Sequence, residues 1–343
     1  VSMRKKQSLR YGENGHQSAA LYLAADAVGA LGAMEQLQGK ELSYNNIRDL
    51  DMAWKTACSF GLPSAGVAPV GAADVERLLG VSAGTPDELR NAKFALPAVV
   101  AVKHNTPCGV ALAPTLLEAY RKTFSCDPVS IYGGIVAANR PIDEMTAAEI
   151  GKIFVEIIIA PDFTEEALAI LTQKKNIRLL KLEDILAKAP KGTVDMKKVS
   201  GGILIQETDN SLFEESELKV VTDRIPTERE MEDMKFAMKV VKHIKSNGIV
   251  FVKDGKTIAI GPGQTNRIWA VENCIKRCLS DMKGSVMASD AFFPFSDCVE
   301  AAAEAGATAI IQPGGSIRDK ESIEKADELG IAMVFSGMRH FKH

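Results

Sequence analysis

A lysine and a histidine stand side by side at the end of an apolar, strand-like run. The run Ala98–Val102 is followed by Lys103, His104 and a loop-forming segment, 105–109. The ends of strands are where α/β sheets place ligands and chemistry. An imidazole accepts a proton near neutral pH, and an adjacent ammonium stabilises a developing anion. The pair therefore predicts acid–base chemistry. The alternative is a structural histidine that caps the strand end, which is the commoner role when a histidine at such a position is considered alone.

Further polar, glycine-bearing blocks are spread along the whole chain. They are Arg10–Gln17 (RYGENGHQ), Tyr132–Ala137 (YGGIVA), Ser289–Phe295 (SDAFFPF), Gln312–Ser316 (QPGGS) and Met338–His343 (MRHFKH). Together with the Lys-His block, they resemble the AICAR transformylase part of the bifunctional purine enzyme AICAR transformylase/IMP cyclohydrolase. The resemblance covers nearly all of the 343 residues, and the blocks occur in the family's order.

The resemblance implies a formyl transfer in de novo purine biosynthesis. The donor would be 10-formyltetrahydrofolate, a co-substrate, and the acceptor the 5-amine of AICAR, a weakly nucleophilic aromatic amine with a ribose 5-phosphate. Such a transfer needs a base for the amine proton, a donor for the tetrahedral oxyanion, and near-attack placement of two bulky ligands. The alternative is an inactive nucleotide-binding or regulatory homologue, against which the intact Lys103, His104 and Asn247 argue.

The catalytic roles follow from the resemblance. His104 would act as the base, and Lys103 would stabilise the oxyanion and protonate the folate N10. Asn247 matches the family's active-site asparagine, whose amide can orient the imidazole or bind the substrate carboxamide. The residues alone favour another role for Asn247, a helix C-cap before Gly248.

The nucleotide site implied by the resemblance needs guanidinium groups for the phosphate. Each arginine by itself would be an ordinary surface charge. Glycine at position 133 would let the backbone approach the nucleotide, because it has no Cβ. The implied substrate-binding residues are Arg10, Tyr11, Asn46, Gly133, Glu156, Phe292 and Arg339.

The folate site needs an apolar slot for the pterin and polar groups at its edge. A run of phenylalanines is otherwise a core segment, but acidic residues flank this one on both sides. The glycine-rich loop 261–268 lacks the P-loop pattern, so no ATP use is expected. The implied folate-binding residues are Arg267, Ile268, Pro294, Phe295 and Asp297.

Departures from the family pattern concern contacts and metal ions. Gly15 stands where relatives often have proline, and Cys298 stands where some have asparagine near the folate. Some relatives bind potassium near the nucleotide. The hydroxyl groups expected near Ile244 and Gly248 are missing here. A potassium site therefore remains an alternative, but the missing hydroxyl groups argue against it.

A zinc deaminase is the third function considered. Its signature is HxE with PCxxC, whereas here His104 is followed by Asn-Thr and Pro107-Cys108 by Gly-Val-Ala. Cys274 and Cys278 share a helix face, but no nearby histidine or cysteine completes a tetrahedral set. We therefore expect no zinc and six reduced thiols.

Alternating strands and helices must position these residues. The pattern predicts a mostly parallel sheet with helices on its faces. Two helices should begin at capping boxes, Thr146–Glu149 and Thr227–Glu230, and Asp254-Gly255 predicts a hairpin turn. The opening blocks are predicted to be loops, 61–86 a surface excursion, and 184–227 a polar crossover after which the pattern restarts.

The resemblance implies an α/β fold of two cytidine-deaminase-like α/β/α halves. We expect the first half, 1–205, to carry the Lys-His motif and the second, 206–343, to carry the folate-side motifs. Relatives are homodimers whose sites straddle the subunit interface, which implies a homodimer here. Nine residues precede Arg10, so we expect no cyclohydrolase part and no closure of formyl-AICAR to IMP.

Composition agrees with an ordinary globular protein of two domains, with 46% hydrophobic and 25% charged residues. A net charge of −3 gives no footprint for nucleic acid. An anionic substrate would need a local basic pocket. The chain has no apolar run of about 18 residues, the length that a membrane span needs. We expect a cytoplasmic protein that binds neither nucleic acid nor a membrane.

Overall fold

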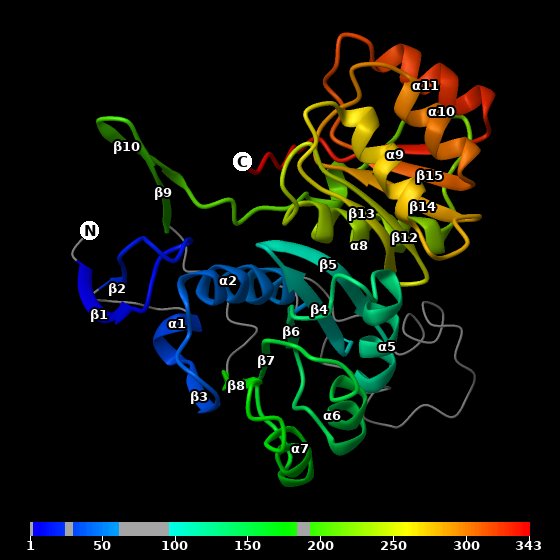
Figure 1. Cartoon of the computed structure of the whole chain (residues 1–343). Helices are drawn as coiled ribbons and strands as arrows, with labels where there is room; N and C mark the ends of the chain where they lie inside the picture. The colour runs from blue at the N-terminus through cyan, green and yellow to red at the C-terminus, as the bar shows by residue number, and fades with distance from the viewer. Residues whose placement is uncertain (1–2, 25–29, 62–95, 184–192) are drawn as a thin grey trace.

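A large mixed sheet forms the centre of the protein in the computed structural model, which describes residues 3–24, 30–61, 96–183 and 193–343 (Figure 1). The strands from the first part of the chain are β3 (Glu35–Gln38), β4 (Ala98–Lys103), β5 (Thr106–Leu112), β6 (Ile135–Ala138), β7 (Ile157–Ala160) and β8 (Arg178–Lys181). Those from the second are β11 (Lys219–Val220), β12 (Ile249–Lys253), β13 (Lys256–Gly261), β14 (Ser285–Ser289), β15 (Ala307–Gln312) and β16 (Ala332–Phe335).

The strand order repeats itself about the middle of the sheet. The order is β11-β16-β15-β14-β12-β13-β5-β4-β6-β7-β8-β3. Outward from the centre, each side therefore has a hairpin, two parallel pairs and an antiparallel edge strand. The two sides meet at β5 and β13, where the Leu112 N–H donates to the Gly255 carbonyl at 2.9 Å.

The prediction of a mostly parallel sheet was wrong for a local reason. A parallel neighbour needs a crossover connection, whereas β4–β5 and β12–β13 are joined by tight turns and must be antiparallel. The turn at Asp254-Gly255 was predicted and is confirmed. The strand β5 was not predicted, because Pro107 and Gly109 interrupt its pattern.

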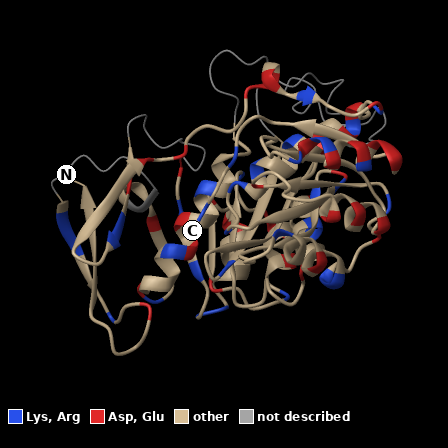
Figure 2. Cartoon of the chain, turned by 90° about the horizontal axis from the view of Figure 1, so that it is seen from above, with Lys and Arg blue, Asp and Glu red and all other residues tan. Residues whose placement is uncertain are grey.

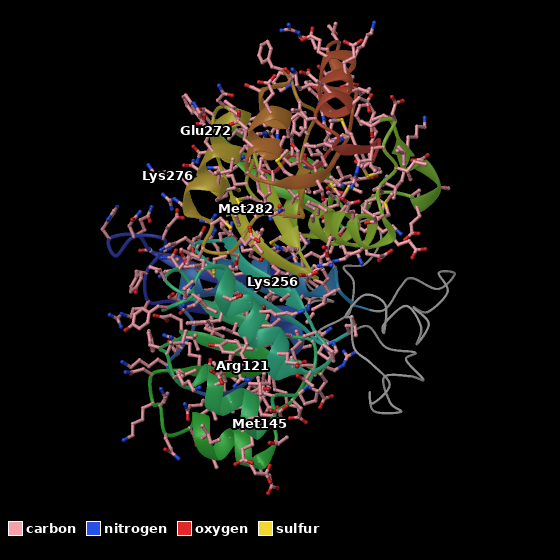
Figure 3. All side chains as sticks on the ribbon, turned by 90° about the vertical axis from the view of Figure 1, so that its right-hand side faces the viewer. Arg121, Met145, Lys256, Glu272, Lys276 and Met282 are labelled. Atoms are coloured by element: carbon pink, nitrogen blue, oxygen red, sulfur yellow. The ribbon has the colours of Figure 1, made fainter. Side chains whose placement is uncertain are left out.

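Helices cover both faces of the sheet and follow the same repeat. On one face lie α2 (Tyr44–Cys58), which precedes β4, and α8 (Glu228–Val241), which precedes β12. The other face carries α5 (Leu116–Cys126), α6 (Glu144–Ile150), α7 (Glu165–Leu171), α9 (Arg267–Arg277), α10 (Asp297–Glu304) and α11 (Asp319–Glu328). Figure 3 shows α5, with Arg121, and α9, with Glu272 and Lys276, on this second face.

Alternation along the strands divides the core into layers. Val100 and Val102 of β4 pack toward α2, whereas Val99 and Ala101 pack toward α5. In β12, Val250 packs toward α8, and its neighbours on either side face the other helix layer. Because successive side chains point to opposite faces, these continuous apolar runs are those of strands covered on both sides.

Helix starts were predicted with mixed success. The capping box of Thr227 and Glu230 is confirmed at the start of α8. The box predicted at Thr146 and Glu149 was wrong, because α6 begins earlier and its N-cap is Asp143, whose carboxylate accepts from the Thr146 N–H at 2.7 Å. A carboxylate at this end also interacts favourably with the helix dipole.

Two hairpins lie outside the main sheet (Figure 1). One pairs β1 (Met3–Leu9) with β2 (Ala19–Ala24), and the other pairs β9 (Val194–Val199) with β10 (Gly202–Glu207). The opening block Arg10–Gln17 was predicted to be a loop, and this is confirmed, because it connects β1 to β2. The crossover predicted for 184–227 does lead from β8 to the second side of the sheet, but the β9–β10 hairpin within it was not predicted. Most side chains of β1, β9 and β10 are exposed, so no apolar alternation marks a buried face in these strands. The excursion predicted for 61–86 lies, apart from Gly61, outside the described residues.

Short elements complete the described chain, α1 (Ala30–Ala33) and a 3₁₀ turn, η1 (Glu215–Glu217). Basic and acidic residues are interspersed over the body of the molecule (Figure 2). None of the helices in the described ranges combines the length and the apolar character that a bilayer crossing needs.

Candidate active site at one edge of the sheet

Strand directions bring the predicted site residues to the same edge of the sheet. β4 ends at this edge, and β6 and β7, which run opposite to β4, begin there. β5, β13, β12 and β14 are successively antiparallel, so β12 begins and β14 ends at this edge too. Lys103, Glu156 and Asn247 therefore share it. Because β5 and β13 lie between β4 and β12, the two halves of the site are about 14 Å apart along the edge, at about 4.8 Å per strand.

The Lys-His pair lies at the turn of the central hairpin. Lys103 is the last residue of β4, and His104 and Asn105 form the turn with φ of 52° and 58°. Two left-handed residues are typical of a type I′ turn, and histidine and asparagine tolerate this conformation better than most. The Lys103 Nζ donates to the Tyr132 carbonyl at 2.6 Å, while the His104 side chain is exposed. The ammonium thus points to the Tyr132-Gly133 loop.

Asp49 on α2 holds this turn, and sequence reasoning missed it. Its carboxylate accepts from the His104 N–H at 3.1 Å and from the Asn105 N–H at 2.6 Å. Burial raises the pKa of Asp49, although both backbone N–H groups and the His104 side chain lower it. Asp49 is the carboxylate that the structure places at the Lys-His turn.

A polar cluster lies where β7 and α2 begin. The Asn46 Nδ2 donates to the Glu156 Oε2 at 3.4 Å, and the Arg178 Nη1 donates to the same oxygen at 2.9 Å. Gly133 is left-handed, with φ of 69°, and its Cβ position is open. The structure thus joins Asn46 to Glu156 and adds Arg178, which was not predicted. Asn46 also completes the capping box of α2 with Ser43.

The two arginines predicted to bind phosphate are exposed, and each lies over a neighbouring ring. The Arg10 guanidinium is 5.4 Å from the Tyr11 ring centroid, beside an open cavity of about 600 Å³ on the β1–β2 hairpin. The Arg339 guanidinium is 4.9 Å from the Phe341 ring. The structure therefore places both guanidinium groups at the surface, Arg10 on the β1–β2 hairpin and Arg339 in the C-terminal segment.

A buried network joins Asn247 to Arg267. The Arg267 Nη2 donates to the Asn247 Oδ1 at 2.6 Å, and its Nη1 donates to the Ser289 Oγ at 2.9 Å and to the Asp290 carboxylate. Arg267 is 5% exposed and Asp290 is fully buried. The helix-cap alternative for Asn247 was wrong, because α8 ends at Val241. Sequence reasoning paired neither Asn247 nor Asp290 with Arg267.

The C-terminal segment is tied to the same network. The His340 N–H donates to the Asp290 carbonyl at 2.9 Å. The Ser246 Oγ donates to the Asp290 carboxylate and accepts from the Lys342 N–H at 3.0 Å. Arg339 directly precedes the anchored residue His340. It is therefore held near the edge of the sheet at which Asn247 lies.

The phenylalanine run after β14 divides between core and surface. Phe293 is fully buried, Phe292 and Pro294 are half-buried, and Phe295 is 51% exposed. The Arg318 guanidinium lies 4.7 Å from the Phe295 ring centroid. The folate-side prediction of Phe295 thus falls on an aromatic ring that the fold leaves open.

The remaining two folate-side residues, Asp297 and Ile268, lie at the starts of two helices. Asp297 is the first residue of α10, and its Oδ1 accepts from the Cys298 N–H at 2.8 Å. Ile268, in the first turn of α9, packs against the second-half core.

No disulfide joins the six cysteines, all of which lie within the described residues. Among the described residues, no group of three or more His, Cys, Asp or Glu side chains is placed to hold a metal ion.

Comparisons with known proteins identify the family of the chain. The sequence model of the AICARFT/IMPCHase bienzyme family matches residues 1–76 and 88–277. A bifunctional purine biosynthesis protein PurH of Acetivibrio thermocellus is 56% identical over 344 residues, covering 100% of this chain and 60% of that protein. Proteins of the same name from Ruminiclostridium cellulolyticum and Clostridium botulinum are 52% and 51% identical, with the same coverage.

The chain thus spans 60% of the length of the curated relatives that it matches. The family match extends through both sides of the repeated sheet, from the β1–β2 hairpin to the last residue of α9. On this match the chain belongs to the AICARFT/IMPCHase bienzyme family.

Proposed function

We propose that this chain transfers the formyl group of 10-formyltetrahydrofolate to the 5-amine of AICAR. The observation that carries the proposal is the Lys103-His104 turn, held at the sheet edge in a member of a family named for this transfer. The exposed imidazole is free to accept the amine proton. The ammonium stands beside it, where it can stabilise the tetrahedral oxyanion.

Asn247 serves in this proposal as the polar group at the second half of the site. Its amide is fixed from both ends, by Arg267 and by the Gln264 carbonyl at 2.9 Å from its Nδ2. An amide so held keeps a defined orientation toward a bound substrate, which preorganisation requires. AICAR would lie along the Lys103, Gly133 and Glu156 side, and the pterin near Ile268, Pro294, Phe295 and Asp297.

The proposal is tested by following tetrahydrofolate formation with purified protein. Tetrahydrofolate should form only when AICAR and 10-formyltetrahydrofolate are both present, and in proportion to the protein added. A rate equal to that without protein would refute the proposed function. Release of tetrahydrofolate without AICAR would indicate hydrolysis of the donor instead.

We further propose that each side of the sheet is a cytidine-deaminase-like half, the first over 1–205 and the second over 206–343. Both sides of the sheet support this proposal, because they have the same order of elements. Each has a helix, then a hairpin, then three further strands, and a helix precedes each of these three strands. The proposed boundary lies in β10, outside the main sheet.

We propose a cytoplasmic location for the chain. Support comes from its six cysteines, none of which forms a disulfide.

The phosphate of AICAR should bind to Arg10 and Arg339. Wild-type protein is expected to bind the nucleotide far more tightly than the nucleoside, because guanidinium–phosphate hydrogen bonds are charge-assisted. Arg10→Ala and Arg339→Ala should each remove much of that difference, measured by calorimetry. Arg318→Ala, which removes an exposed arginine over an aromatic ring elsewhere, is the matched control. A preference for the phosphate form that survives in both variants would place the pocket elsewhere.

We propose that the chain forms a homodimer with shared sites. Support comes from the β9–β10 hairpin, where Ile203 and Ile205 share one face of β10 and Leu204 lies on the other, each at least 60% exposed. Large apolar side chains left exposed in this way often mark an interface. The exposed Phe295 would likewise be enclosed by a second surface.

Subunit mixing tests the shared site. His104→Asn chains and Phe295→Asp chains, each inactive alone, should regain up to about a quarter of wild-type activity after exchange by random pairing. Arg267 is unsuitable for this experiment because it is buried in an ion pair. Absence of recovery despite demonstrated exchange would mean that each site is built within one chain.

A further inference from the structure

The two halves repeat a device that binds a hairpin turn to a helix. In the first half, the capping residue Ser43 is followed by Asn46 and then by Asp49. In the second half, Thr227 is followed by Glu230 and Asp233 at the same spacing. Both helices begin with a capping box, so each aspartate lies at the same turn of its helix. The spacing is visible in the sequence once the two helix starts are aligned.

The aspartates make the same contacts in both halves. Asp49 accepts from the backbone N–H groups of His104 and Asn105, at 3.1 and 2.6 Å. Asp233 accepts from those of Asp254 and Gly255, at 2.9 and 2.8 Å. In each case one carboxylate fixes both central residues of a tight turn. Burial raises the pKa of Asp233 to about 6 and raises that of Asp49 as well, so in both halves a carboxylate is partly removed from water at this position.

The turns differ in what they carry and where they lie. The second turn has Gly255 at one left-handed position, and its Asp254 side chain pairs with Arg229. It lies at the edge of the sheet opposite the candidate site, beside Leu112 at the end of β5. The first turn lies at the site edge and puts His104 and Asn105, neither of them glycine, into left-handed backbone. A non-glycine pair in this conformation is held less easily by the backbone alone.

We propose that Asp49 is a positioning residue, which sets the place of the His104 imidazole by fixing the turn that carries it. The proposal rests on formyl transfer as the function. Asp49 acts on the turn, because its two carboxylate oxygens accept from the two central backbone N–H groups, one each. Its effect passes through the backbone to His104, and through β4 to Lys103. A displacement of about 1 Å at a reacting group can cost on the order of 10²-fold in rate.

The chain supplies its own matched control for this proposal. Asp49→Asn keeps the shape of the side chain but leaves only one acceptor oxygen, so one turn N–H loses its partner. Asp233→Asn makes the same change at the turn far from the site. If the device were only structural, the two variants would have the same small effect on catalysis.

The experiment measures kcat and KM for AICAR together with amide hydrogen exchange. Asp49→Asn should lower kcat on the order of 10-fold to 10²-fold while KM stays within about twofold, because chemistry is misaligned and binding is not. Exchange at the His104 and Asn105 amides should accelerate. Asp233→Asn should accelerate exchange at Asp254 and Gly255 and leave kcat within about twofold.

Each outcome decides between the positioning role and the alternatives. Wild-type kcat in Asp49→Asn would overturn the role of Asp49, whatever the exchange rates. An equal loss of kcat in Asp233→Asn would show a general effect on folding and would overturn it too. Unchanged exchange at His104 and Asn105 would mean that Asp49 does not hold the turn. If the wild-type protein itself shows no formyl transfer, the proposed function is refuted and the Asp49 role falls with it. The wild-type assay gives this result before any variant is made.

Discussion

His104→Asn is expected to lower kcat by roughly 10²–10⁴-fold while leaving AICAR binding near that of the wild type. The variant removes the imidazole that we propose as the acceptor of the amine proton. Asparagine is chosen because it tolerates the left-handed backbone of this turn, where φ is 52°, so the turn is kept while the imidazole is lost. Steady-state rates and calorimetry with AICAR measure the two effects separately.

Asp254→Asn is the control for this variant. It places asparagine at the equivalent residue of the second turn, where φ is 57°, and it also removes a charge paired with Arg229. Its kcat should stay within about twofold of the wild type. Near-normal turnover in His104→Asn would remove His104 as the base. A large loss of AICAR binding would assign it to substrate contact.

Arg267→Met is expected to lower the free energy of unfolding by about 3–5 kcal/mol. The guanidinium is 5% exposed and pairs with the fully buried Asp290. Its removal leaves a carboxylate inside the protein without its cation, which is far more costly than the loss of a surface pair. Chemical denaturation measures the change, and Arg318→Met, at an exposed arginine paired with Glu321, should change it by less than about 1 kcal/mol.

The same variant separates two roles for Arg267. If the guanidinium holds Asn247 and Asp290 in place, loss of stability and loss of activity should appear together. A variant with wild-type stability but a much higher KM for the folate would contradict the structural role. It would return Arg267 to the direct folate contact that the sequence resemblance implies.

Motifs predicted single elements better than the contacts between them. The apolar run before Lys103 marked β4, and the Asp254-Gly255 turn marked the β12–β13 hairpin, because apolar runs and left-handed turns have clear residue signals. The pairing of Arg267 with Asp290 had no such signal. These residues come from α9 and the end of β14, and only the sheet order brings them together.

The hairpins outside the sheet show a second limit of the sequence. β9 and β10 expose both faces, so their residues follow no period-two burial pattern that could be recognised. β5 was hidden for another reason, since Pro107 and Gly109 lie within it. Asp49 was hidden only because the two helix starts were not compared. Its spacing from Ser43 repeats that of Asp233 from Thr227, and this repeat is present in the sequence.

The proposed function requires that one carbon move from the folate to the amine of AICAR on this chain. A single-turnover reaction with 10-formyltetrahydrofolate labelled with ¹³C in the formyl group tests it most directly, with mass spectrometry of the products. The label is expected in formyl-AICAR, with tetrahydrofolate formed in equal amount, and His104→Asn should stop both. Label found only in free formate, or AICAR recovered unchanged, would contradict formyl transfer by this chain.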